Sequence, residues 1–168
     1  HSIDYSLTTP WLKNYKRNPY PHTFLWEDYP MDGQRRLGFY NLHVLQRPKA
    51  ADGLKDTSGE DRDYYEMDIK DNVIRLSVRK VTYQTVERDP VYGIDLKFAK
   101  SYHPTSGGKW KIYLNDQLVD MNKPITIFIN DRKVFEGKIV PRMEDMITSC
   151  MEYFDPCRVF PASVDVAL

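Results

Sequence analysis

Alternating apolar and polar positions dominate the chain after residue 21 and predict strands rather than helices. Turn-forming residues separate these stretches. The clearest pair flanks Asn130 and Asp131, which accept the left-handed conformations of a tight hairpin turn. The predicted strands are His22–Glu27, Leu37–Gln46, Tyr64–Ile69, Val73–Val86, Ile94–Phe98, Lys109–Leu114, Ile125–Ile129, Val134–Val140 and Pro161–Leu168.

The stretch Val73–Val86 changes phase part-way along. Apolar residues occupy every second position as far as Val78, but beyond Lys80 the apolar set begins again at Val81. Because strand side chains alternate between the two faces of a sheet, such a slip predicts a bulge or corner near Arg79 and Lys80.

One helical pattern lies near the C-terminus. Pro141 suits its first turn, and Asp155–Pro156 ends it. We expect its apolar stripe to pack on the core, with the charged residues outside. The stripe, at spacings i, i+3, i+4, i+7, i+8 and i+11, consists of Met143, Met146, Ile147, Cys150, Met151 and Phe154.

The first 21 residues lack a strong period. Pro10 suits the start of a short helix through Trp11, Leu12 and Tyr15, and the two prolines of Asn18–Pro21 end it. The sequence therefore predicts an N-terminal arm or junction over residues 1–21 and one domain over residues 22–168. The expected fold is mainly β: a β-sandwich, immunoglobulin-like or jelly-roll-like, with one amphipathic C-terminal helix.

Charge and hydropathy narrow the range of partners. The 24 basic and 24 acidic residues cancel, which removes the positive field of a general nucleic-acid binder. No apolar run approaches the ~20 residues that span a bilayer. We therefore expect no nucleic-acid partner and no membrane span. The mixed-charge stretch Lys49–Asp63 predicts an exposed loop.

The sequence contains no complete active site that we recognise. There is no G-x-S-x-G elbow, and Ser58 and Ser106 precede glycines in loops. The histidines lack metal-ligand spacing, and the acidic stretch Asp52–Asp63 is typical of a solvated loop. We therefore expect no metal and no cofactor. Cys150 and Cys157 allow either a disulfide or a buried thiol. The four histidines are His1, His22, His43 and His103.

The aromatic residues suggest one binding function. Exposed rings on a β-sandwich could bind a polysaccharide, although most of these residues are expected to fill the core or cover its rim. The candidate platform consists of Trp26, Tyr29, Tyr40, Tyr64, Tyr65, Tyr83, Tyr92, Tyr102 and Trp110.

The C-terminal part resembles a β-rich module of bacterial secreted α/β-hydrolases, the esterase or prolyl-oligopeptidase-like proteins common in gut Bacteroidetes and Planctomycetes. The resemblance covers residues 109–168, and residues 30–108 carry no part of it. Arg17–Pro21 resembles the junction that leads into that module. The segments that carry the resemblance are Lys111–Asp120, Lys123–Asn130, Lys133–Gly137, Asp155–Pro156 and Phe160–Ala162.

This resemblance implies a non-catalytic C-terminal accessory domain, periplasmic or extracellular, that packs on the catalytic α/β-hydrolase domain of the same polypeptide or aids substrate presentation. Trp11, Tyr15 and Tyr20 are expected in the contact. The resemblance also implies that His1 is the third member of a catalytic triad. Its nucleophile and carboxylate would then precede position 1, because a triad histidine acts only beside both. Two alternatives remain open: His1 simply begins a processed chain, or the chain is itself an enzyme with an unfamiliar site.

Overall fold

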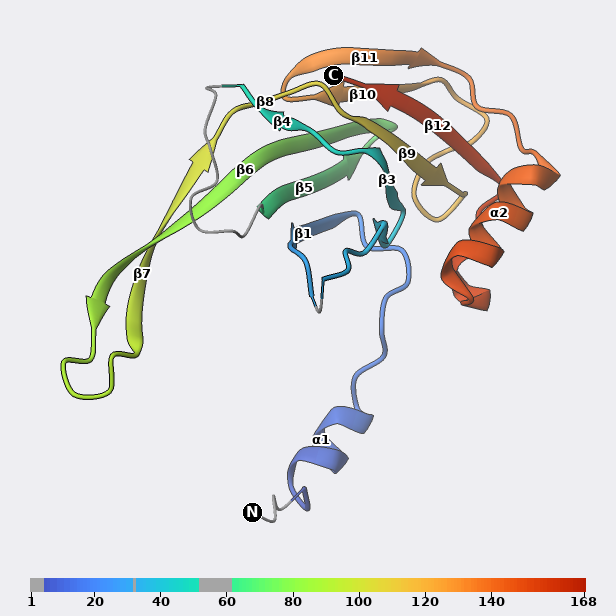
Figure 1. The fold of residues 1–168 in the computed structure, drawn as a ribbon. Helices are drawn as coiled ribbons and strands as arrows, with labels where there is room; N and C mark the ends of the chain where they lie inside the picture. Colours follow the sequence, from blue (N-terminus) through green and yellow to red (C-terminus); the bar gives the residue numbers. More distant parts are fainter. Residues whose placement is uncertain (1–4, 32, 52–61) are drawn as a thin grey trace.

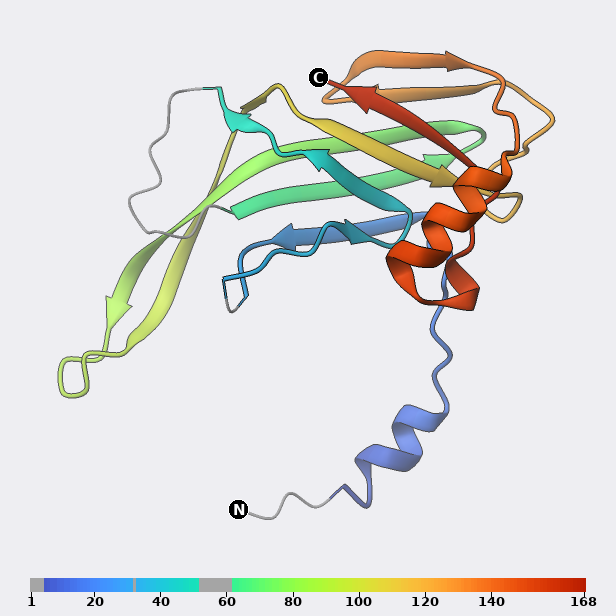
Figure 2. The same ribbon diagram turned by 45° about the vertical axis from the view of Figure 1, so that its right-hand side comes forward.

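The computed structural model describes residues 5–31, 33–51 and 62–168. It shows a mainly β, sandwich-like domain with one longer helix outside it and a helical arm at the N-terminus (Figures 1 and 2). The elements are α1 (Thr8–Lys13), β1 (Thr23–Asp28), β2 (Gly38–Phe39), β3 (Leu42–Gln46), β4 (Lys49–Ala50), β5 (Arg62–Lys70), β6 (Val73–Arg88), β7 (Asp95–His103), β8 (Thr105–Ser106), β9 (Lys109–Leu114), β10 (Ile125–Ile129), β11 (Arg132–Gly137), α2 (Met143–Tyr153), the short 3-10 helix η1 (Pro156–Arg158) and β12 (Ala162–Ala167).

Two sheets form the layers. The larger has the order β1-β5-β6-β10-β11, with β7 paired to the outer part of β6. The second has the order β12-β9-β3-β2, and β4 pairs with β8 in a small ribbon. Strands β6 and β10 are parallel, with Thr126 opposite Val73. Beyond β10 the Asn130 side chain continues this pairing, since its Oδ1 accepts the N–H of Val78 at 2.7 Å and its Nδ2 donates to the Val78 carbonyl at 3.1 Å.

The core lies between the two sheets, where the alternating side chains of both inner faces meet. Leu42, Tyr65, Trp110 and Ile127 are among the fully buried side chains. The hairpin predicted around Asn130 and Asp131 is confirmed as β10–β11, and both turn residues have positive φ.

A charged network closes one end of this core. Asp28, Asp63 and Lys80 are buried on neighbouring strands of one sheet, with Asp63 opposite both of the others in the strand register. Asp63 Oδ1 lies 2.6 Å from Lys80 Nζ. Arg47, which follows β3 of the other sheet, donates to both carboxylates. Because buried charges require partners, this network links the two layers through ion pairs.

The bulge predicted near Arg79 and Lys80 is wrong. The register of β5 against β6 runs without a shift from Lys70–Val73 to Arg62–Val81. Lys80 keeps the inward position of the alternation and is buried against Asp63, which a count of apolar residues cannot reveal. The register shifts of β6 occur further on, between Thr85 and Arg88 in its pairing with β7.

Several other predicted strands differ in extent, and the predicted Val134–Val140 is observed as β11 over Arg132–Gly137. Leu37–Gln46 divides into β2 and β3, because Tyr40 adopts φ 50° and the chain reverses so that Phe39 faces Leu42. Strand β7 runs from Asp95 to His103, beyond the predicted Ile94–Phe98. Residues 52–61 of the predicted exposed loop lie outside the described residues.

Candidate interaction surface

A long hairpin of β6 and β7 extends away from the sandwich (Figures 1 and 2). Among the described residues, β5 pairs with β6 as far as Val81, and the outer part of β6 pairs with β7. An isolated two-stranded ribbon is marginally stable in water. Its apolar side chains are exposed. Exposed apolar patches are typical of surfaces that a partner covers. The exposed large apolar residues of this segment are Val86, Val91, Tyr92, Ile94, Leu96 and Phe98.

The tip of the hairpin has a fixed turn. Asp89 Oδ1 accepts the backbone N–H groups of Val91 at 2.8 Å and Tyr92 at 2.7 Å. Gly93, at φ 67°, donates its N–H to the Asp89 carbonyl at 3.0 Å. Val91 and Tyr92 are each 78% exposed. The turn therefore presents two apolar side chains in a conformation that is already ordered, which lowers the entropy cost of binding.

A polar and aromatic cluster supports the base of the hairpin. Glu27 accepts hydrogen bonds from Lys100 at 2.6 Å, Tyr83 at 3.0 Å and Arg62 at 3.1 Å. Burial alone would raise the pKa of Glu27, but these three donors outweigh it and lower the pKa. Because β1 contributes Glu27 and β7 contributes Lys100, the bonds tie the hairpin to the sandwich.

The tyrosines of this cluster surround the Lys100 ammonium group. Lys100 Nζ lies 5.0 Å from the ring centroid of Tyr64, 5.6 Å from that of Tyr83 and 5.2 Å from that of Tyr102. Tyr64 and Tyr102 meet edge to face, with centroids 5.1 Å apart. The Arg62 guanidinium lies 4.4 Å from the Tyr29 ring. The arrangement is a cation–π cluster, open on its outer side at Tyr102.

The other predicted platform aromatics are distributed differently. Tyr92 lies at the hairpin tip, and Tyr40 packs against Phe24 and Phe39. Trp26, Tyr65 and Trp110 belong to the buried core and cannot contact a ligand on the surface.

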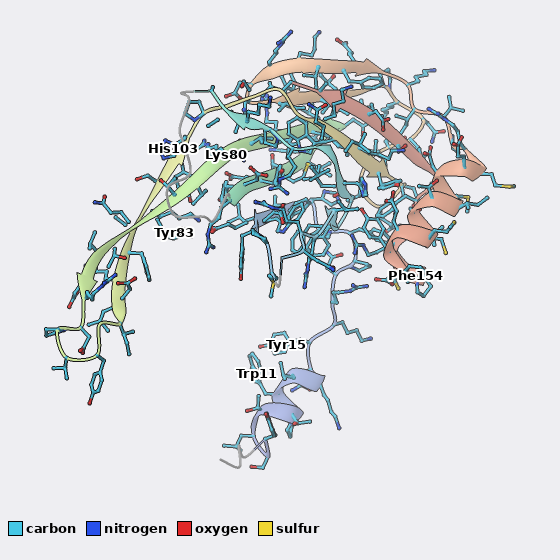
Figure 3. All side chains as sticks on the ribbon, viewed as in Figure 1. Trp11, Tyr15, Lys80, Tyr83, His103 and Phe154 are labelled. Carbon is cyan, nitrogen blue, oxygen red and sulfur yellow. The ribbon has the colours of Figure 1, made fainter. Side chains whose placement is uncertain are left out.

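The N-terminal arm is a second projecting apolar element. Helix α1 contains Trp11 and Leu12 as predicted but ends at Lys13, before Tyr15, and no residue of it is buried. Figure 3 shows Trp11 and Tyr15 on the same side of the arm; their ring centroids are 4.7 Å apart. At the root of the arm, Arg17 Nη2 donates to Asp155 Oδ2 at 2.5 Å. Tyr20 instead packs edge to face on Phe160, so it is partly removed from the expected contact surface.

Helix α2 is oriented opposite to the prediction. Met143, Met146, Ile147, Met151 and Phe154 are exposed, and only Asp145 and Ser149 of the helix are buried. The predicted core packing of the apolar stripe is therefore wrong.

Cys150 and Cys157 are both free and exposed, which contradicts the predicted disulfide and the predicted buried thiol alike.

Polar contacts explain this orientation. The outer face of the second sheet offers hydrogen-bonding side chains, and the polar stripe of α2 meets them. Ser163 Oγ donates to Asp145 Oδ1 at 2.6 Å, and the Phe160 N–H donates to Ser149 Oγ at 2.9 Å. Tyr113 Oη donates to Glu152 Oε2 at 2.8 Å.

His43 lies in the same layer as Glu152 and Tyr113. Its Nδ1 is 3.2 Å from Glu152 Oε2. Burial lowers the pKa of His43, despite the nearby Glu152 carboxylate, and burial together with the Glu152 contact raises the pKa of Tyr113. His43 is a buried residue of β3, and among the described residues its Nδ1 makes no hydrogen bond.

The remaining candidate residues do not lie together in one site. His1 lies outside the described residues, as does Ser58. His22 bonds the Gln117 carbonyl at 2.8 Å, and His103 bonds Thr82 Oγ1 at 2.9 Å on the hairpin. Within residues 5–31, 33–51 and 62–168, no group of His, Cys, Asp or Glu side chains could hold a metal ion.

No family model, curated protein or solved structure matches this chain. In the part of the chain that the structure describes, no helix is long and apolar enough to cross a membrane. The candidate site is therefore defined by geometry alone. It comprises the hairpin, the arm and the outward face of α2, three apolar surfaces that lie outside the core.

Sequence reasoning missed the hairpin as a site. The strands were predicted, but their pairing beyond the sandwich was not. A usable signal was present: Val91 and Tyr92 in the turn and Ile94, Leu96 and Phe98 after it lie in a stretch that also carries Arg88, Asp89 and Asp95. The apolar side chains of this stretch are exposed instead of packing in the core.

Proposed function

We propose that this chain is the non-catalytic C-terminal accessory domain of a secreted serine hydrolase, esterase-like or peptidase-like. It packs on the catalytic α/β domain of the same polypeptide, in the periplasm or outside the cell, and helps to present substrate. The observation that carries the proposal is the apolar β6–β7 hairpin, which extends beyond the sandwich with its tip fully formed. Such an element is stabilised when a partner buries it.

The direction of the arm supports the same partner. The hairpin and α1 both project downward from the sandwich in Figure 1, and still do so in Figure 2, which is turned about the vertical axis. One globular domain on that side could contact both. Interfaces between domains of one chain are commonly of this partly apolar kind.

The coding sequence before His1 provides the first test. A G-x-S-x-G elbow between a strand and a helix, followed by an aspartate before His1, is expected. It would make His1 the third triad residue. If a secretion signal ends directly before His1 instead, the proposal is overturned.

Val91→Asp in the parent polypeptide tests the contact itself. Val91 is 78% exposed at the hairpin tip, so a charge there should leave this domain folded but weaken docking. Hydrogen exchange of residues 86–98 is expected to be at least about tenfold slower in the parent than in the isolated chain, and the variant should lose that protection. Val140→Asp, at a 67% exposed valine before α2, is the matched control. Equal exchange in parent and isolated chain would refute the docking.

A second candidate function is polysaccharide binding, supported by the tyrosine cluster around Lys100. Sugar rings stack on aromatic faces, and Tyr102 is the exposed member. Affinity electrophoresis in gels containing plant or host glycans should show retardation of the chain, and Tyr102→Ala should abolish it. Tyr5→Ala, at an exposed tyrosine of the arm, should change nothing. Unretarded migration in every glycan gel would exclude this function.

A further inference from the structure

The outward stripe of α2 cannot reach the core by rotation of the helix. The inner face is held by the bonds of Asp145 to Ser163, of Ser149 to the Phe160 N–H and of Glu152 to Tyr113. Turning the stripe inward would break all three and remove Tyr153 from its ring contacts with Tyr113 and Phe160. The stripe is therefore covered from outside or remains in water. Phe154, at the end of the helix, is 88% exposed (Figure 3).

The spacing of the stripe makes it complementary to itself. Positions i, i+3, i+4, i+7, i+8 and i+11 give the same pattern when read in either direction, with Phe154 as the C-cap residue directly after the helix. Antiparallel pairing with a second α2, about a twofold axis between Thr148 and Ser149, matches every member with another member. Members three or four positions apart lie on one face of a helix, and two helices can pack side by side along such faces. The matched positions are Met143 with Phe154, Met146 with Met151 and Ile147 with Cys150.

The charges at the two ends of α2 favour the antiparallel direction. Arg142 precedes the helix and Glu144 lies in its first turn. Asp155 follows the helix, with Arg17 bound to it. Arg142 also lies 4.0 Å from Asp145 of its own helix. Antiparallel pairing brings the Arg142–Glu144 end of one helix next to the Asp155–Arg17 pair of the second copy. Parallel pairing would instead place each charged residue beside the same residue of the second copy, which carries the same charge. Antiparallel helix dipoles also attract each other.

We propose that the outward face of α2 is a homodimer contact, formed by antiparallel pairing of α2 helices from two copies of this chain. A twofold contact requires a surface that is complementary to itself, and the stripe fulfils this condition. One 11-residue helix from each copy covers less than the ~1,200–2,000 Å² of a standard interface, so the dimer is weak and reversible. The contact uses neither the hairpin nor the tip of the arm and is independent of the proposed function.

Met151→Glu tests the contact. Sedimentation of the purified chain over micromolar to millimolar concentration should show a monomer–dimer equilibrium. The substitution should raise the dissociation constant of the dimer at least tenfold, because the twofold axis places the new charge in the contact twice. Met31→Glu, at a methionine exposed on the β1–β2 connection, should leave the constant unchanged. Met151 is exposed in the monomer, so at concentrations at which the chain is monomeric the melting temperature of both variants should match that of the unsubstituted chain.

Cross-linking provides an independent readout. With Cys157→Ser, a short bismaleimide should join two chains through Cys150, which lies next to the proposed axis and is exposed. With Cys150→Ser and Cys157 intact, the cross-linked dimer should be lost. The proposal is overturned by a monomer at all concentrations, by a dimer that Met151→Glu does not weaken, or by cross-linking that needs only Cys157.

Discussion

Asp63→Ala is expected to destabilise the domain by about 3–5 kcal/mol, the usual cost of removing one partner from a buried ion pair. The Asp63 side chain is fully buried and lies 2.6 Å from Lys80 Nζ. It also accepts a hydrogen bond from Arg47, which follows a strand of the other sheet. Without the carboxylate, Lys80 and Arg47 lose these contacts. The free-energy cost of removing both cations from water remains. Urea unfolding followed by circular dichroism measures the change in the free energy of unfolding.

Asp68→Ala provides the control for this loss. Asp68 lies on the same strand as Asp63, but its side chain is exposed. A surface substitution away from special features changes the free energy of unfolding by about 0.5 kcal/mol or less. If Asp63→Ala costs no more than Asp68→Ala, the charged network does not hold the two sheets together.

Gly108→Ala should destabilise the domain by about 3 kcal/mol, through overpacking and backbone strain together. A Cβ at Gly108 would lie 2.4 Å from Cη2 and 2.7 Å from Cζ2 of Trp110, a side chain that is fully buried and cannot move aside. Gly108 also has φ 103°, in the region that disfavours other residues. In a domain of this size the loss corresponds to roughly 6–12 °C in melting temperature.

Gly107→Ala separates the two contributions. Gly107 has φ 63°, but a Cβ there meets no atom within 4 Å. It should therefore cost only the strain, about 1–2 kcal/mol. Thermal unfolding, with Trp110 as part of the fluorescence signal, compares the two variants. Equal losses would mean that the contact with the indole ring carries no energy.

Local patterns in the sequence were enough to place most elements. The β10–β11 hairpin follows from two alternating stretches around Asn130 and Asp131, whose side chains tolerate positive φ. The position of α2 follows from its period. The orientation of α2 does not, because a period identifies two faces and the partner sheet decides which is buried. Here the hydroxyl groups of Tyr113 and Ser163 on the outer sheet face donate to Glu152 and Asp145, so these helix residues turn inward.

Lys80 and the β6–β7 hairpin show a second limit of sequence reasoning. A lysine in an alternating strand counts as an outward position, and only its pairing with Asp63 permits burial. Likewise, the length of a strand does not reveal where its neighbour ends. Within residues 62–168, the pairing of β5 reaches Val81, while β6 continues to Arg88. The projecting hairpin is a consequence of that difference in length, which no local pattern encodes.

The parallel junction of β6 with β10 has a consequence for the order of assembly. Val78 and Asn130, which bond across it, are 52 residues apart in the chain. The β5–β6 and β10–β11 ribbons can each close locally and early, but joining them requires a large loop to close first. Such distant pairings slow folding toward milliseconds to seconds. During synthesis, the β6 edge must therefore remain without this neighbour until residue 130 has left the ribosome.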